Sequence, residues 1–551
     1  MASKRVLPQG VTEATLHDFF EHVEGILGKE NVSRDNTTGA LEGLNGDHAY
    51  IDPFATGHLR TANGAARPNS PEQVSAVLKA ANQFKIPLWT FSRGKNLGYG
   101  GSAPLVDGSV ILDLHRMNKI IELNEQYAYA ILEPGVSFLD LYDAIQERGL
   151  KLWMSAPGIG WGSVLGNCLD RGYGHGVTGE HSQNQCGLEV VTPIGEILRS
   201  GMGAMSDSKL WPLHKGGFGP SIDGLFFQSN LGVVTKIGVH LCPAPEAFMT
   251  CEVSVYKRED LGPLTALLSD LYRKRIIGNA PSITDVYRQC LRSKDPNVLE
   301  RVMPFVLQAR ALPKKLKEEI RVEQGWGHWL AFFALFGTTE VVPAQLASIK
   351  RAILEIPGAK ITTTSWPGVP GEALKASVMG EHEIPQSGVP TMQTLRRFFG
   401  DGSGRGHVTF SPILPPAAKE VNSYYMEAED ILDEEDANNF GDIHITERFI
   451  YAISLINFLP NQAQKVRRTF RKLFDLAAKQ GYTEYRTHLD FMDDVAAQLD
   501  FNGHALRKYT TLLKDATDPH GILSPGKSGI WPSNSGFRKP SETPLIDLNG
   551  C

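Results

Sequence analysis

The chain has 551 residues, of which 42% are hydrophobic and 21% charged, and its formal net charge is −6 at pH 7. One hydrophobic core stops growing at about 250–300 residues, so this length predicts two domains. The slightly acidic balance excludes the strongly basic surfaces that bind nucleic acid or acidic membranes. We therefore expect no nucleic-acid partner and no membrane partner.

The cysteines and the two ends of the chain indicate where the protein works. None of the six cysteines forms a CxxC pair or a spacing typical of zinc sites, so we expect reduced thiols and no metal. There is no signal-peptide core and no apolar run of about 18 residues. The final residues, 547–551, carry no peroxisomal tripeptide and no prenylation box. These features predict an intracellular, cytoplasmic protein.

The first half of the chain alternates helix-like and strand-like patterns. Residues 71–82 have the apolar spacing of a helix, and residues 86–91 read as a short buried strand. A glycine-rich loop follows that strand directly. Further strands are predicted at 109–114, 128–132, 188–192 and 233–241. The pattern indicates an α+β nucleotide-binding domain covering residues 1–245.

The composition changes near residues 243–245, where two prolines flank an alanine. Beyond this point we predict long amphipathic helices, at 261–277 and 345–356, and strands at 329–336 and 450–458. We assign residues 246–481 to a cap domain that covers the substrate. Residues 482–551 are predicted to return to the first domain.

Two glycine clusters and one histidine suggest a bound dinucleotide. The clusters are FSRGKNLGYGGSA at 91–103 and GWGSVLGNCLDRGYGHGVTG at 160–179. Glycine lets backbone amides approach a pyrophosphate closely. Far away in sequence, His407 stands in the run GRGHVTFSP, from which an imidazole could reach the redox ring of the same cofactor. A lone histidine is more often an ordinary buried strand residue, so the other motifs must decide.

Two familiar nucleotide motifs match by letters but not by context. Residues 174–179 fit GxGxxG, yet neither the preceding strand nor the following helix of that fingerprint is predicted. Residues 521–528 fit the P-loop pattern, yet Gly529 and Pro532 forbid its helix. We reject both. Lys527 then contacts an anion or a flavin carbonyl, or is simply a surface lysine in a turn.

Eight blocks occur in a fixed order along most of the chain: YGG, EPGV, GSVLGN, IDGLF, SNLGVVTKIG, HVTFSP, EYRTHL and PGKSGIWP. In this order the chain resembles the vanillyl-alcohol oxidase and para-cresol methylhydroxylase family of flavoproteins. The resemblance implies an α+β fold, with a PCMH-type FAD-binding domain of two α+β subdomains and an α+β cap domain over the isoalloxazine.

The resemblance also implies how FAD is held. His407 corresponds to the covalent histidyl ligand of the flavin, a bond that prevents cofactor loss and raises the flavin potential. The branch with a tyrosyl link uses a position slightly upstream, where Phe398 and Phe399 stand here. The candidate cofactor-binding residues are His407, Ser92, Arg93, Gly94, Lys95, Asn96, Leu97, Pro157, Gly158, Gly162, Ser163, Gly166, Asn167, Gly187, Gly232, Val233 and Lys527.

Three further residues match the positions at which the family binds a phenolate. A phenol ionises near pH 10, so a site that needs the phenolate at neutral pH requires donors and a fixed positive charge. Tyr99, Tyr485 and Arg486 supply two hydroxyls and a guanidinium. The alternatives are that Tyr99 only packs in its glycine loop and that Arg486 only forms a salt bridge.

The implied activity is oxidation of a para-substituted phenol of the vanillyl-alcohol, eugenol or 4-alkylphenol type. Hydride leaves the benzylic carbon for the flavin, a para-quinone methide forms, and O2 reoxidises the flavin to give H2O2. Two alternatives remain. One is a dehydrogenase that uses another electron acceptor, and the other is a flavoprotein that binds a phenolic ligand with little turnover.

Two departures from the oxidase pattern carry further expectations. Gly158 stands where the oxidase has an aspartate near the flavin, so we expect slow turnover of vanillyl-type alcohols. Glu447 and Arg448 are candidates for the pocket, with exposed cap residues as the alternative. The segment 204–218 is short where the octameric oxidase has a long insertion, so we expect a homodimer.

Overall fold

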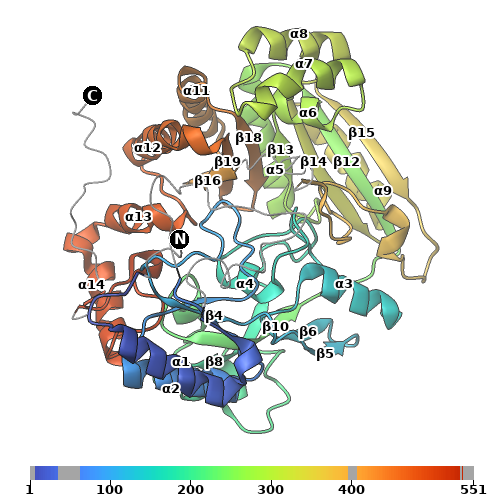
Figure 1. Cartoon of the computed structure of the whole chain (residues 1–551). Coiled ribbons are helices and arrows are strands. Elements are labelled where there is room, and N and C mark those ends of the chain that lie inside the picture. The colour runs from blue at the N-terminus through green and yellow to red at the C-terminus, as the bar shows by residue number, and fades with distance from the viewer. Residues whose placement is uncertain (1–5, 35–61, 395–405, 534–535, 538–551) are drawn as a thin grey trace.

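A computed structural model describes residues 6–34, 62–394, 406–533 and 536–537 (Figure 1). The α+β class predicted from the sequence is confirmed, since helices and mostly antiparallel sheets occur together in both the first half of the chain and the cap. Within the described ranges, no helix is long and apolar enough to cross a membrane.

The first subdomain is a small sheet covered by two helices. The order of its strands is β1-β2-β4-β3, and β3 and β4 run parallel with Leu88 beside Val110. Ser70 caps α2 through its side chain and proline occupies the first turn, as expected for a helix start. The elements are α1 (Glu13–Leu27), β1 (Val32–Ser33), β2 (Ala65–Ala66), α2 (Pro71–Phe84), β3 (Leu88–Phe91) and β4 (Val110–Asp113).

The second subdomain is an antiparallel sheet in the order β5-β6-β10-β8-β9. A capping box between Ser137 and Asp140 starts α3, which packs on this sheet with α4. The elements are β5 (Ile120–Asn124), β6 (Tyr129–Leu132), α3 (Phe138–Glu147), β7 (Leu152–Trp153), α4 (Val164–Leu169), β8 (Gln185–Val191), β9 (Ile197–Arg199), β10 (Val233–His240) and β11 (Cys242–Pro243).

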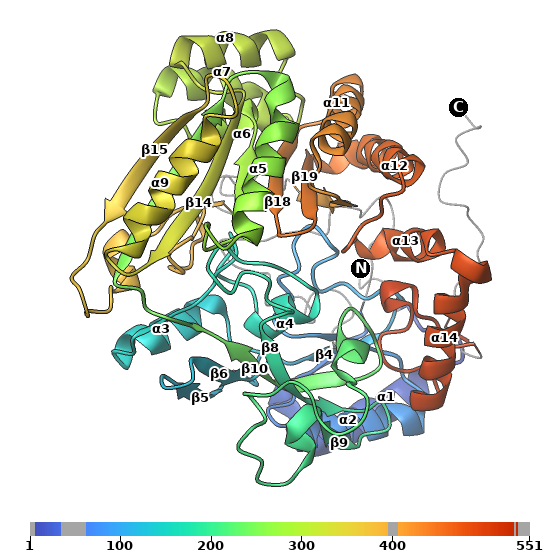
Figure 2. The ribbon, with the colours of Figure 1, turned by 180° about the vertical axis from the view of Figure 1, so that it is seen from behind.

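The cap is built on a larger sheet, with eight strands among the described residues and the order β15-β12-β14-β13-β18-β19-β16, plus β17 beside β19. Figure 2 shows α5, α9, α11 and α12 over one face of it. The strands are β12 (Ala247–Val255), β13 (Ser282–Thr284), β14 (Trp329–Gly337), β15 (Lys360–Trp366), β16 (Gly406–Phe410), β17 (Ile413–Leu414), β18 (Asn439–Ile445) and β19 (Ile450–Phe458). The helices are α5 (Leu261–Arg273), α6 (Val286–Arg292), α7 (Pro296–Leu307), α8 (Lys314–Gln324), α9 (Val341–Ile353), α11 (Ala418–Glu434) and α12 (Ala463–Lys479).

The last segment of the chain lies against the first subdomain. It contains α13 (Met492–Gln498) and α14 (Phe501–Thr517), seen in red in Figure 1. The amide of Leu88 donates to the carbonyl of Ile522 (2.7 Å), and that of Ser524 donates to the carbonyl of Leu88 (2.7 Å). Strand β3 is thus flanked by β4 on one side and by residues 522–524 on the other. The exact domain boundaries, 245/246 and 481/482, stay predictions.

Both rejected nucleotide motifs lack the helix that each would need. Residues 174–179 form a turn closed by a hydrogen bond from the Gly174 amide to the Gly179 carbonyl (2.8 Å). The lysine of the P-loop match begins only a short 3-10 turn, Lys527–Gly529.

Candidate active site

A cavity of about 370 Å³ lies between the two subdomains of the first half, the cap sheet and the C-terminal segment. All of the residues predicted to bind the cofactor or the phenolate, except Gly187, line it. The lining comes from five parts of the chain: Ser92 to Leu97 and Tyr99 from the first glycine loop; Pro157 and Gly158 just before the second glycine cluster and Gly162, Ser163, Gly166 and Asn167 within it; Gly232 just before β10 and Val233 at its start; His407 from β16; and Tyr485, Arg486 and Lys527 from the C-terminal segment.

Strand alternation decides which residues of β16 face the cavity. His407 and Thr409 line it, whereas Val408 and Phe410 are buried in the core under the cap helices. The opposite wall is the glycine loop, where Gly98 has a φ of 82° and a Cβ would overlap the His407 ring. Only glycine permits this approach. The Thr409 amide donates to the Gly98 carbonyl (3.3 Å), which fixes the strand against the loop.

The His407 imidazole is neutral and shielded from water. His407 is only 6% exposed. Burial lowers the pKa of its imidazole to about 3, with a smaller contribution from nearby His488. A neutral imidazole keeps a nitrogen lone pair, which a nucleophile requires.

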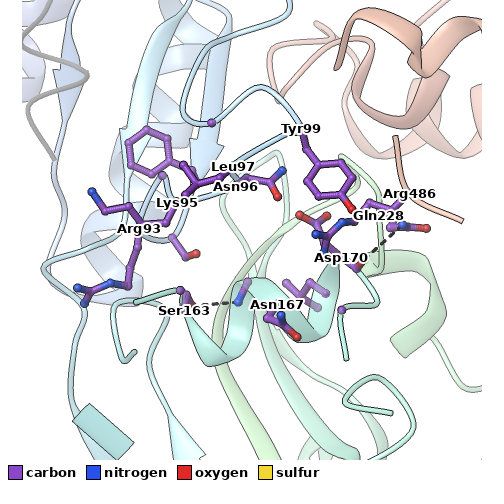
Figure 3. Close-up of a pocket in the computed structure, with 18 of the residues that line it drawn as sticks. Arg93, Lys95, Asn96, Leu97, Tyr99, Ser163, Asn167, Asp170, Gln228 and Arg486 are labelled. Atoms are coloured by element: carbon purple, nitrogen blue, oxygen red, sulfur yellow. Dashed lines mark hydrogen bonds between the residues drawn. The ribbon is translucent and has the colours of Figure 1, made fainter. Parts of the chain in front are cut away.

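The cationic end of the glycine loop fits the diphosphate of FAD. Figure 3 shows Arg93 and Lys95 together on one side of the cavity. Arg93 Nε and Lys95 Nζ are buried without a hydrogen-bond partner in the described structure. Burial, and then the neighbouring Arg93, lowers the pKa of Lys95 to about 8. An anionic ligand here would satisfy both donors and relieve the repulsion between them.

Tyr99 and Arg486, two of the three residues predicted to bind a phenolate, lie together on the other side of the cavity (Figure 3). The guanidinium carbon of Arg486 lies 3.9 Å from the ring centroid of Tyr99. The Leu489 amide donates to the Tyr99 carbonyl (3.2 Å), and Gln228 Nε2 donates to the Tyr485 carbonyl (2.7 Å). These hydrogen bonds fix the backbone of Tyr99 and Tyr485 at the cavity wall, which helps to preorganise the group.

The charges of this group favour an anionic ligand. Arg486 Nε is buried and has no hydrogen-bond partner in the described structure. Burial opposes the charge of Arg486, but the hydroxyls of Tyr99 and Tyr485 outweigh it and raise its pKa. Burial, and then Tyr99, raises the pKa of Tyr485 well above its ordinary value. The site thus presents a fixed cation, Arg486, beside a neutral Tyr485 hydroxyl.

Lys527 forms an ion pair at the wall of the cavity. Its Nζ lies 3.3 Å from Asp170 Oδ1, and both side chains are about one-fifth exposed at 21% and 22%. The residue also lines the cavity. The lysine is therefore an ion-pair partner at the cavity wall rather than a solvated surface residue.

Three expectations from the sequence are not met in the cavity. Gly187, on β8, does not line it, because its α-carbon faces the indole of Trp211 and a Cβ there would overlap that ring. Glu447 and Arg448 do not line it either. Glu447 pairs instead with Arg448 (2.9 Å) and with Arg275 (2.5 Å). Phe398 and Phe399 lie outside the described residues.

The structure adds lining residues that the sequence interpretation did not include: Tyr173, His175, Arg288, Glu383 and Asp442. The signal for two of them is a charge within an apolar pattern. Asp442 alternates with buried Ile443 on β18, and Arg288 lies in α6 among buried neighbours. The sequence did not predict that Arg288 from α6 and Asp442 from β18 would line the same cavity.

Gly158 leaves free space beside the cavity. It does not adopt a positive φ, and an added Cβ would meet only Thr394 Oγ1, at 3.7 Å. The backbone would therefore accept a side chain at this position.

Known families match two parts of the chain. The FAD binding domain model matches residues 62–201, and the model of the C-terminal domain of FAD linked oxidases matches residues 375–528. With a cavity that fits FAD, these matches define the protein as an FAD-dependent oxidoreductase.

Comparison with whole proteins narrows this class. The flavoprotein subunit of 4-cresol dehydrogenase (hydroxylating) from Pseudomonas putida is 31% identical over 537 residues, covering 95% of this chain and 98% of that protein. The structure of 4-ethylphenol oxidase from Gulosibacter chungangensis, an isoeugenol complex, matches with a TM-score of 0.86 and 31% identity, covering 96% of this chain and 99% of that one. p-Cresol methylhydroxylase with substrate bound matches with a TM-score of 0.84 and 30% identity, covering 96% and 99%. The chain belongs to the vanillyl-alcohol oxidase and para-cresol methylhydroxylase family, and its first half has the PCMH-type FAD-binding fold.

Proposed function

We propose that the protein oxidises para-substituted phenols at the benzylic carbon, using FAD bound in the cavity. The observation that carries this proposal is the meeting of Tyr99, Tyr485 and Arg486 in the same cavity as His407. The names of the similar proteins, which act on 4-cresol and 4-ethylphenol, support the same substrate class.

The protein's own residues account for binding and activation. Arg486 compensates the charge of the phenolate, and the hydroxyls of Tyr99 and Tyr485 donate to its oxygen. Because these groups are buried, each interaction is stronger than it would be in water. FAD, when bound, supplies the acceptor for the hydride that leaves the benzylic carbon. The substrate becomes a para-quinone methide, which then takes up water or rearranges.

We also propose that His407 holds FAD covalently. Its ring is neutral, buried and pressed against the glycine loop. Acid-precipitated wild-type protein should keep its yellow colour and fluoresce on a denaturing gel, whereas His407→Ala should release its flavin. Free flavin in the supernatant of the wild type would contradict the link.

The fate of the electrons is the second part of the proposal. We favour O2 as the acceptor, with H2O2 as the product, because the histidyl link accompanies oxidases in the family. The alternative is an electron-transfer partner, which the name of the related dehydrogenase supports.

One experiment tests the activity and its alternatives. Under anaerobic conditions, 4-ethylphenol should bleach the flavin spectrum, while 4-ethylanisole, which cannot ionise, should not. A perturbed but unbleached spectrum would mean binding without turnover. Admission of air to the reduced protein should restore the colour with release of peroxide. Recovery only with an added electron-accepting dye would assign a dehydrogenase.

A further inference from the structure

The cavity lined by Tyr99, Tyr485 and Arg486 is also lined by Arg288, Glu383 and Asp442, a group that we call the charged end. Arg288 NH1 lies 3.2 Å from Asp442 Oδ2, and Arg288 NH2 lies 3.4 Å from Glu383 Oε1. The three side chains are only 6%, 3% and 6% exposed. Two carboxylates thus share one guanidinium inside the substrate cavity.

Tyr173 connects the charged end to the phenolate-binding residues. Its ring centroid lies 5.7 Å from that of Tyr451, which in turn lies 4.4 Å from that of Tyr485. Burial raises the pKa of the Tyr173 hydroxyl well above its ordinary value, and both Asp442 and Tyr485 add to this effect. Tyr173 is therefore within electrostatic reach of both regions.

The charged end contains acceptor capacity that the protein does not use. Asp442 Oδ2 faces Arg288, but Asp442 Oδ1 is buried and has no hydrogen-bond partner in the described structure. His175 Nδ1, which belongs to another residue of the cavity lining, is also buried without a hydrogen-bond partner among the described residues. A ligand that buries this acceptor without donating a hydrogen bond to it therefore binds less tightly.

The charges select among possible occupants. Glu383 has a second cationic neighbour, because Arg292 Nε lies 3.6 Å from Glu383 Oε2. Arg292 itself does not line the cavity. Arg288 is already shared by two carboxylates, so a carboxylate on the substrate would be repelled by Asp442. An alkyl group would cover Asp442 Oδ1 without satisfying it. A hydroxyl or a protonated amine would donate to it.

We infer that the charged end binds a hydrogen-bond donor, a hydroxyl or a protonated amine, at the end of the para side chain of the phenol. This inference rests on the proposed function. It assigns the preferred substrate to phenols with a polar, non-anionic side chain, in contrast to the simple alkylphenols that the names of the similar proteins mention.

Matched substrates test the inference. 2-(4-Hydroxyphenyl)ethanol and 4-propylphenol have the same length and differ only in a terminal hydroxyl or methyl group. We expect the hydroxyl compound to reduce the flavin at least about tenfold more efficiently, because an unpaired buried acceptor discriminates against the methyl compound. Tyramine tests the amine, and 4-hydroxyphenylacetate should be the poorest substrate.

Equilibrium binding gives a readout that does not depend on turnover. 4-(2-Hydroxyethoxy)phenol and 4-propoxyphenol carry an oxygen in place of the benzylic carbon, so neither can lose a hydride there. Titration of the flavin spectrum should give a dissociation constant about tenfold lower for the hydroxyl compound.

Asp442→Asn removes the acceptor charge at nearly constant shape and should reduce both preferences for the hydroxyl compounds. Asp436→Asn is the matched control, because Asp436 pairs with Arg310 (2.8 Å) at a half-exposed surface site, and it should leave both preferences unchanged. If Asp442→Asn fails to fold, the wild-type comparison still decides.

Equal use of 4-propylphenol and 2-(4-hydroxyphenyl)ethanol by the wild type would overturn the inference and leave the proposed function standing. The same holds if 4-hydroxyphenylacetate is preferred. If no phenol bleaches the flavin but the matched ethers still differ in affinity, the proposed function fails and the binding site remains.

Discussion

At the scale of single residues, we expect loss of a positive charge to have its largest effect in the group proposed to bind the phenolate, Tyr99, Tyr485 and Arg486. Arg486→Ala removes the cation and should slow anaerobic flavin reduction by several orders of magnitude, since each tenfold corresponds to about 1.4 kcal/mol. Tyr485→Phe should cost less, because Tyr99 and Arg486 remain. Arg486→Lys, which keeps a cation in place, is the control. Unchanged reduction in Arg486→Ala would remove the phenolate from the mechanism.

Gly158 is the residue at which this chain departs from the oxidase pattern. Its surroundings leave room for a side chain, since only Thr394 Oγ1 would lie within 4 Å of an added Cβ, at 3.7 Å. We expect slow turnover of vanillyl alcohol by the wild type and a gain of about tenfold or more in Gly158→Asp, because a carboxylate would stabilise developing positive charge. Gly158→Asn separates charge from volume. Wild-type turnover of vanillyl alcohol at about 10 per second would show that the carboxylate is dispensable.

The residues predicted to bind the phenolate and to link the flavin share a property: each stands in one of the eight ordered sequence blocks. Tyr485 and Arg486 are adjacent in one block, and His407 lies in another. Arg288 and Asp442 could not be found in this way, because their meeting depends on how α6 and β18 are placed in the cap. The resemblance to the family predicted Gly187 as a cofactor residue, but its missing Cβ makes room for Trp211 instead.

At the scale of elements, the end of β16 is held by a carboxyl group. The Ser411 amide donates to Glu484 Oε1 (2.9 Å), directly before Tyr485 in the chain. Burial raises the pKa of Glu484 to about 8. The neutral carboxyl thus joins the strand that carries His407 to the segment that carries Tyr485.

This carboxyl predicts a pH dependence of stability. Above pH 4.5 the unfolded chain loses the proton, while the folded protein keeps it up to about pH 8. The stabilisation is therefore complete below pH 4.5 and falls as the pH rises to about 8. Glu484→Gln has no carboxyl to titrate at this position, so its stability should not fall with pH for this reason. Relative to the variant, the wild type should lose up to about 1.4 kcal/mol per pH unit in urea unfolding between pH 5 and 8. Parallel curves for the two proteins would show that Glu484 titrates normally.

Element types followed well from apolar periodicity. Strand β19 begins and ends at the predicted residues, Ile450 and Phe458. The predicted helix over 261–277 ends earlier, at Arg273, because the residues beyond it form a tight turn with Arg275 at a φ of 60°. Sheet order could not be predicted in the same way, since pairing between distant strands leaves no local pattern.

At the scale of the whole molecule, the short segment 205–217 bears on assembly. We expect a closed dimer, the commonest arrangement for a soluble homo-oligomer. Light scattering should therefore report twice the chain mass of 60.5 kDa. A mass eight times that of the chain would contradict the interpretation of this segment.

The pairing of Leu88 with residues 522–524 also constrains the order of events during synthesis. Strand β3, which leads into the first glycine loop, gains its second neighbour only after more than 400 further residues have been made. Buried Lys514 holds residues 522–524 in place, because its Nζ donates to the carbonyls of Asn230 (2.8 Å) and Leu523 (2.7 Å). The amino-terminal sheet of a nascent chain on the ribosome therefore has an open edge, and this sheet cannot be completed until residues 522–524 have been synthesised.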